Sequence, residues 1–285
     1  MTRRDRLVLV IAGSDPSGGA GLELDLKVLA LLGVHGAAVA SCHTLQSATG
    51  MRAVASASPG LARRQLALLR RDAAIGAVKI GMLPGADWIA LAASTLARLP
   101  RIPSVYDPVF RPTIGRRTLA RSALARVRKE LLPRVTLLTP NAVEAAELLD
   151  ATLDDVARDP DGAARALLRL GARAVLLKGG HLPAHDRIVD RLRGAYGERD
   201  FESLRRTGPA PRGTGCALAA AIAAGLLRDL DPRAAIARAR RWLDRARAEA
   251  LALGRGRPAL GLVASAIPAR VGGRSPRGGA AAGAV

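Results

Sequence analysis

Aromatic residues and cysteine are scarce in this sequence of 285 residues. Aromatic side chains make up 2% of the chain, whereas hydrophobic residues make up 49%, so we expect Leu, Val, Ile and Ala to pack the interior. The two cysteines, Cys42 and Cys216, are too few for a disulfide framework, and no zinc-type Cys/His spacing is present. These absences argue against a small disulfide-rich or zinc-bound scaffold and favour a reducing compartment.

Long apolar runs are also absent. The longest runs from Cys216 to Leu227, well short of the roughly 20 residues that span a bilayer. The first residues, MTRRDRLVLVIAG, carry too short an apolar stretch for a secretory signal. We therefore predict a cytoplasmic protein with no membrane partner.

Positive charge is abundant, with a formal net charge of +20, which raises the hypothesis of nucleic-acid binding. The arginines are scattered along the chain, however, and are not interleaved with aromatic residues. We favour solvated helix faces rich in Arg over a nucleic-acid partner. Only four lysines occur, and Lys27, Lys79 and Lys178 fall within the motifs described below.

Short β-rich runs alternate with longer Ala/Leu/Arg-rich segments. This rhythm predicts an α/β fold with a mostly parallel sheet covered by helices on both faces. Strands are expected at 7–12, 37–40, 77–80, 104–106, 135–139 and 174–178, and helices at 21–32, 61–72, 87–99, 122–132, 215–227 and 232–251. The short runs within 188–204 predict an antiparallel hairpin at a sheet edge. We place one domain at 1–253 and a Gly/Ala/Pro/Arg-rich tail at 254–285, with a disordered end.

Two glycine-rich junctions join a predicted strand or loop to a helix. The first, IAGSDPSGGAGLELDLK, holds Gly13, Gly18, Gly19 and Gly21, and it predicts either a ligand pocket at the end of a strand or a turn that only needs flexible glycines. The second, PRGTGCALAAAIAAGL, places Gly213–Cys216 at the start of an apolar helix. Its free N–H groups would bind an anion and favour the thiolate of Cys216, making this residue a candidate base or nucleophile. The alternative for Cys216 is a small buried packing residue.

Polar side chains follow three more predicted strands. Asp107, Asn141 and Glu144 offer hard oxygen ligands for Mg²⁺ with a nucleotide triphosphate. Alternatively, Asp107 is a turn residue and Glu144 belongs to a helix-opening turn. Lys178 and Gly180 in AVLLKGGHL put a cation and a close-approach backbone where phosphates could lie.

Taken together, these motifs resemble those of the hydroxymethylpyrimidine/phosphomethylpyrimidine kinase family. The matching segments, all in family order, are GSDPSGGAG, DLK, the Gln of TLQSATG, AVKIGML, DPV, TPN with a following Glu, KGGH and GTGC. The resemblance implies a ribokinase-like three-layer α/β/α sandwich. It also implies ATP-dependent phosphorylation of 4-amino-5-hydroxymethyl-2-methylpyrimidine, and then of its monophosphate, in thiamine biosynthesis.

The resemblance also implies roles for individual residues. In the substrate pocket it places Gln46 on the aminopyrimidine, Asp25 and Met82 nearby, and Gly13, Gly18 and Gly19 in the wall. For catalysis it gives Cys216 as the base and the Gly213, Thr214 and Gly215 amides as charge stabilisers. For ATP and Mg²⁺ it gives Lys178, Asn141, Gly180 and Arg212 near the nucleotide, and Asp107 and Glu144 as metal ligands.

Three departures from the family pattern are present. VFRPTIG follows Asp107 where a small residue, a Lys and a Ser-Gly pair are expected, Arg212 replaces a His before GTGC, and Gln46-Ser47-Ala48 replaces Gln-Asn-Thr. Arg111 or Arg212 could supply the missing phosphate contact. The alternatives left open are a pyridoxal-type kinase of the same fold, a non-catalytic pyrimidine-binding protein and, third, a nucleic-acid-binding protein. Family members are often dimeric, so a homodimer is possible.

Overall fold

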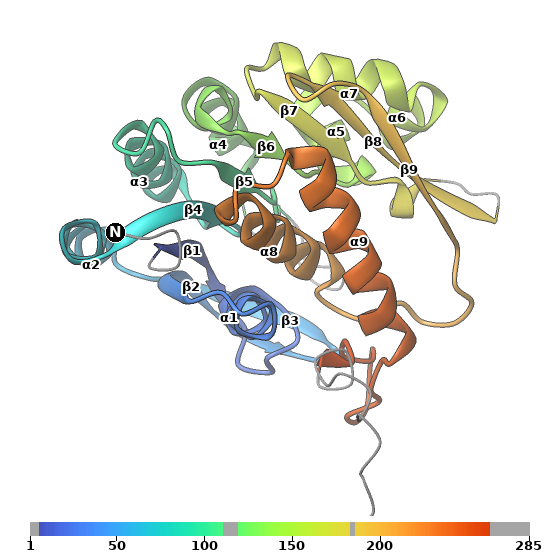
Figure 1. Cartoon of the computed structure of the whole chain (residues 1–285), viewed down its shortest axis with the longest axis horizontal. Helices are drawn as coiled ribbons and strands as arrows, with labels where there is room; N and C mark the ends of the chain where they lie inside the picture. The colour runs from blue at the N-terminus through green and yellow to red at the C-terminus, as the bar shows by residue number, and fades with distance from the viewer. Residues whose placement is uncertain (1–5, 111–118, 183–185, 263–285) are drawn as a thin grey trace, which may run out of the picture.

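The computed structural model describes residues 6–110, 119–182 and 186–262, and a single sheet runs through this part of the chain (Figure 1). Its strands lie in the order β3-β2-β1-β4-β5-β6-β7-β8-β9. They are β1 (Arg6–Ser14), β2 (Gly36–Ser47), β3 (Gly50–Ser56), β4 (Ala74–Ile80), β5 (Ser104–Tyr106), β6 (Leu137–Leu138), β7 (Ala174–Leu177), β8 (Arg187–Gly194) and β9 (Arg199–Leu204). Neighbouring strands from β2 to β7 in this order are parallel. Strand β3 is antiparallel to β2, β8 is antiparallel to β7, and β9 is antiparallel to β8. The predicted parallel sheet with an antiparallel edge hairpin is confirmed.

Helices cover both faces of this sheet and give the three layers that the sequence predicts (Figure 1). One layer holds α1 (Gly21–Leu31), α8 (Thr214–Leu227) and α9 (Pro232–Ala248). The other holds α2 (Pro59–Asp72), α3 (Ala86–Ala97), α4 (Arg121–Arg126), α5 (Ala142–Leu149), α6 (Leu153–Arg158) and α7 (Pro160–Arg169). In β1, Val8 and Val10 pack into the first core while Leu9 and Ile11 pack into the second. Central strands are therefore apolar at successive positions because both faces are buried.

Several elements differ from the sequence prediction. Strand β2 continues past residue 40 to Ser47 and pairs with β3, which was not predicted. The helix predicted at 122–132 becomes α4, a π-helical turn η2 (Val127–Leu131) and a 3-10 turn η3 (Leu132–Arg134). Pro133 in that last turn lacks the backbone N–H that a continuing helix needs. Helices α6 and α7 were also not predicted.

The fold continues beyond the predicted domain end at residue 253. The backbone of Leu251 bridges to Ala259, and the N–H of Gly261 donates to the carbonyl of Ala246 at 2.9 Å. The side chain of Leu260 is buried in the core beneath α9. The first nine residues of the predicted tail, 254–262, are thus part of the domain, whereas 263–285 lie outside the described residues. Across the described helices, none combines the length and apolar character needed to cross a membrane.

Candidate active site

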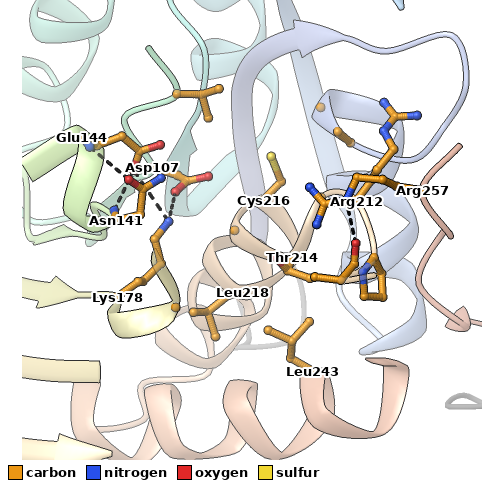
Figure 2. A pocket seen from close by; sticks show the side chains of 18 of the residues that line it. Asp107, Asn141, Glu144, Lys178, Arg212, Thr214, Cys216, Leu218, Leu243 and Arg257 are labelled. Atoms are coloured by element: carbon orange, nitrogen blue, oxygen red, sulfur yellow. Dashed lines mark hydrogen bonds and ion pairs between the residues drawn. The ribbon is translucent and has the colours of Figure 1, made fainter. Parts of the chain in front are cut away.

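A cavity of about 810 Å³ lies at the carboxyl ends of the parallel strands, where open α/β sheets bind ligands. The strand ends supply its wall from one side and the start of α8 from the other (Figure 2). The predicted site residues that line it are Gly13, Gln46, Met82, Asp107, Asn141, Glu144, Lys178, Gly180, Arg212, Gly213, Thr214, Gly215 and Cys216. Residues predicted from separate segments are therefore brought together in one cavity.

One end of the cavity holds two buried carboxyl groups beside a lysine. The Nζ of Lys178 donates to Asp107 Oδ1 at 2.7 Å and lies 3.9 Å from Glu144 Oε2. Burial, and then the nearby charge of Asp107, raises the pKa of Glu144 to about 8, against the opposing effect of Lys178. Additional positive charge at this end would therefore favour ionised Glu144.

Asn141 and Glu144 also form the start of α5. The Oδ1 of Asn141 accepts a hydrogen bond from the Glu144 N–H at 3.0 Å, and Glu144 Oε2 accepts one from the Asn141 N–H at 2.7 Å. This is a capping box, the helix-opening turn that the sequence offered as an alternative. It fixes the Glu144 carboxyl group beside Lys178.

The two carboxyl groups suit Mg²⁺ held jointly with phosphates. No cluster of three or more His, Cys, Asp or Glu residues that could bind a metal occurs within 6–110, 119–182 and 186–262. Mg²⁺ needs only one or two protein carboxylates when substrate phosphates supply further oxygens. Asp107 and Glu144 fit that ligand set by number and by donor type.

Glycines at the start of α8 allow its backbone to approach both walls. Gly213 has φ +71°, and a Cβ there would lie 2.2 Å from the carbonyl oxygen of Gly19. At Gly215 a Cβ would lie 3.2 Å from Lys178 Nζ. The first-turn N–H groups have no acceptor within the helix, and among the described residues no side chain caps this end. They are available for an anion bound near Cys216.

Cys216 lines the cavity from the first turn of α8 (Figure 2). Burial raises the pKa of its thiol to about 12, with Asp107 and Asp25 adding to the rise and Lys79 opposing it. Burial therefore favours the protonated thiol in the free protein, against the effect of Lys79. The role of Cys216 as a base stays a prediction, and additional positive charge near the thiol would favour the thiolate.

Asp25 lies behind the cavity wall. Its Oδ2 accepts a hydrogen bond from Lys79 Nζ at 2.6 Å, and both side chains are fully buried. Lys79 lines the cavity but Asp25, which was expected near the substrate, does not. The structure instead makes Asp25 the counter-ion of a buried lysine.

Arg212 holds the first glycine-rich loop. Its Nη2 donates to Asp15 Oδ2 and its Nη1 to Ser17 Oγ, both at 2.9 Å. Both partners belong to this loop, and Arg212 also lines the cavity; its contact with the nucleotide stays a prediction. Gly18 and Gly19 lie in this loop but do not line the cavity as predicted.

The other end of the cavity is formed by the β2–β3 turn and the loop after β4. Gln46 Nε2 lies 3.5 Å from Asp15 Oδ2, and the Met82 carbonyl accepts a hydrogen bond from Ser41 Oγ at 2.6 Å. This end combines an amide with apolar atoms, as a heteroaromatic ring requires. Asp15 and Arg257 also line the cavity. Neither residue was predicted to have a role, although Asp15 lies within the GSDPSGGAG motif. Arg111 lies outside the described residues.

Comparison with known proteins agrees with this geometry. The profile of the phosphomethylpyrimidine kinase family matches residues 15–260. The chain belongs to this family. The hydroxymethylpyrimidine/phosphomethylpyrimidine kinase of Escherichia coli K12 is 38% identical over 242 residues, covering 85% of this chain and 91% of that protein. The thiamine biosynthesis bifunctional protein ThiED of Geobacter sulfurreducens is 40% identical over 249 residues, and the match covers 87% of this chain but half (50%) of that protein.

Solved structures of phosphomethylpyrimidine kinases and of pyridoxal kinases share the fold. The phosphomethylpyrimidine kinase of Clostridium difficile 630 has a TM-score of 0.71 and 30% identity, covering 84% of this chain and 98% of that chain. An ADP complex of Bacillus subtilis pyridoxal kinase has a TM-score of 0.77 and 30% identity, covering 90% of this chain and 96% of that chain. The ribokinase-like sandwich implied by the sequence is confirmed.

Proposed function

We propose that this chain transfers the γ-phosphoryl group of ATP to the hydroxymethyl oxygen of 4-amino-5-hydroxymethyl-2-methylpyrimidine, and then phosphorylates the monophosphate to the diphosphate. The observation that carries this proposal is the placement of Cys216 and the α8 amides between two ends of one cavity. Lys178 and two carboxyl groups form the nucleotide end, and Gln46 with Met82 forms the pyrimidine end. Figure 2 shows Cys216 between the Lys178 group and Arg212.

Each part of the phosphoryl transfer is given to a group that lines the cavity or lies beside it. The substrate oxygen forms a bond to the γ-phosphorus as the bond from that phosphorus to the β,γ-bridging oxygen breaks, and ADP leaves. Cys216, as the thiolate, accepts the hydroxyl proton, and the N–H groups of Gly215 and its neighbours stabilise charge on the transferring group. Asp107 and Glu144 would hold Mg²⁺, which neutralises phosphate charge. Lys79 and Lys178 lower the free energy of the thiolate.

A pyridoxal-type kinase is the second candidate, supported by the likeness to pyridoxal kinase of Bacillus subtilis at 30% identity. A pyridine alcohol offers the same reacting group on a ring of similar size. Competition between the two alcohols would distinguish these functions. If the pyrimidine binds but neither alcohol is phosphorylated, the protein is a pyrimidine-binding protein without catalysis.

The test is ADP release by the purified protein with Mg-ATP and the hydroxymethylpyrimidine, with pyridoxal as the competing substrate. We expect turnover of the pyrimidine and a fall of about 100-fold or more in kcat for Cys216→Ala. Thermal unfolding of the variant controls for misfolding. Turnover that survives this substitution would remove Cys216 from the role of base. A cytoplasmic location and a homodimer stay predictions, to be tested by fractionation of cells and by light scattering.

A further inference from the structure

The segment Gly256–Pro258 joins two loops of the cavity. The backbone N–H of Arg257 donates to the carbonyl of Ala48 at 3.1 Å, and the N–H of Arg212 donates to the carbonyl of Pro258 at 2.9 Å. A Cβ at Gly256 would lie 2.5 Å from the Ala48 oxygen. The segment thus packs tightly between the β2–β3 turn, which follows Gln46 at the end of β2, and the loop that leads into α8.

The side chain of Arg257 lines the cavity from this segment. Its Nε donates to the carbonyl of Ala210 at 2.8 Å, which fixes the direction of the guanidinium group. Among the residues that the structure describes, its Nη1 and Nη2 have no hydrogen-bond or ion-pair partner. Four N–H bonds on these two atoms are therefore available to a ligand.

Within the part of the chain that the structure describes, Arg257 forms no ion pair with an acid. Arg212 has Asp15 as its counter-ion at 2.9 Å, whereas the charge that acts on Arg257 is the positive charge of Arg212. Burial first, and then Arg212, lowers the pKa of Arg257. A bound anion would relieve both effects, and a phosphate matches the planar guanidinium with two parallel hydrogen bonds.

The position of Arg257 indicates which phosphate would bind. Figure 2 shows Arg257 and Arg212 on the side of Cys216 away from Asp107 and Lys178, the pair at the proposed nucleotide end. The hydroxymethylpyrimidine is a neutral alcohol and offers this guanidinium no anion, whereas its monophosphate does. We propose that Arg257 binds the phosphate of the pyrimidine monophosphate and determines specificity for the second phosphorylation. This inference rests on the proposed function.

The test compares both substrates in the wild type and in Arg257→Ala. We expect kcat/KM for the monophosphate to fall at least about 10-fold, and kcat/KM for the neutral alcohol to change less than about twofold. The Kd of the monophosphate, measured by calorimetry without ATP, should rise by a similar factor. Arg257→Lys should recover part of the loss, since it restores the charge without the paired geometry.

Arg255→Ala is the matched control, because Arg255 is exposed, lies two residues away and does not line the cavity. It should leave both substrates unaffected. Equal losses for the two substrates in Arg257→Ala would mean a structural role and would overturn the inference, as would no loss for either. If the Ala variant unfolds, the ratio of the two kcat/KM values in Arg257→Lys decides.

Activity of the wild type distinguishes failure of this inference from failure of the proposed function. Turnover of both pyrimidines with no selective effect of Arg257→Ala sinks this inference and leaves the proposed function standing. Turnover of the alcohol alone also overturns it, because no monophosphate is then used. Turnover of neither pyrimidine removes the proposed function, and the inference with it.

Discussion

At the scale of single residues, the state of the Cys216 thiol decides how the site can work. Burial raises its pKa to about 12, so only a very small fraction is thiolate near neutral pH. The thiolate is the species that reacts with iodoacetamide. We expect the rate of Cys216 alkylation in the free protein to rise about tenfold per pH unit, without a plateau below pH 10.

Peptide mass spectrometry after timed alkylation measures this rate. Cys42 is an internal comparison, because burial raises its pKa to about 11 and its side chain is fully buried. It should react more slowly than Cys216, which lines the cavity. A plateau of Cys216 alkylation near pH 7 would contradict the pKa assignment and would restore the thiolate expected from the helix terminus alone.

The positions of residues at strand ends were easier to predict from the sequence than the contacts of residues that form side-chain ion pairs. Asp107, Glu144 and Lys178 meet because parallel strands end at one edge of the sheet, which follows from topology. The ion pairs of Asp25 and Arg212 were not predicted because they depend on side-chain partners, Lys79 and Asp15, from distant parts of the sequence. Spacing along the chain does not contain that information.

At the scale of elements, the ion pair of Asp25 and Lys79 joins α1 to β4 inside the core. Both side chains are fully buried, and Asp25 Oδ1 has no hydrogen-bond partner within the described residues. We expect Asp25→Asn to lower the free energy of unfolding by roughly 3–5 kcal/mol, because it leaves a buried ammonium group without its counter-ion. Urea denaturation followed by circular dichroism measures this change.

The double variant Asp25→Leu with Lys79→Met separates charge from packing. It removes both charges and keeps side chains of similar size, so it should be more stable than Asp25→Asn. A single variant as stable as the wild type would show that Lys79 does not need Asp25. A double variant less stable than Asp25→Asn would show that packing, and not charge, dominates this contact.

Strands buried on both faces were predictable because their apolar runs are continuous. Strand β3 and the end of β2 were missed because much of their surface is exposed, including Leu45 at 64%. Their residues carry no clear alternation of apolar and polar side chains, which is the signal that a half-buried strand should give. This region includes Gln46, so the local structure around Gln46 was the least predictable part of the site.

At the scale of the whole molecule, the C-terminal segment contributes to both stability and site geometry. Chains ending at residue 253 and at residue 262 differ only by residues 254–262, so comparing them tests this contribution. The shorter chain loses the burial of Leu260 and the Gly261–Ala246 hydrogen bond. We expect it to be less stable by about 2 kcal/mol and to bind the pyrimidine more weakly.

Thermal unfolding and pyrimidine titration of the two chains measure these effects. Equal melting temperatures would mean that 254–262 adds no stability to the fold. Equal pyrimidine affinity would mean that the wall formed by Gly256–Pro258 is not needed by the ring itself, which would leave Arg257 acting on the phosphate alone.

The late position of this segment also has a consequence for biosynthesis. A ribosome releases β1, β2 and β4 early, and each later strand from β5 to β9 adds beside the one before it. The sheet can therefore grow while translation continues, but the hydrogen bonds of Arg257 and Pro258 to Ala48 and Arg212 form only near the end. Ligand binding stabilises a folded chain in proportion to its affinity, so a nascent or C-terminally clipped protein that binds the pyrimidine more weakly would gain less protection against proteolysis from its ligand.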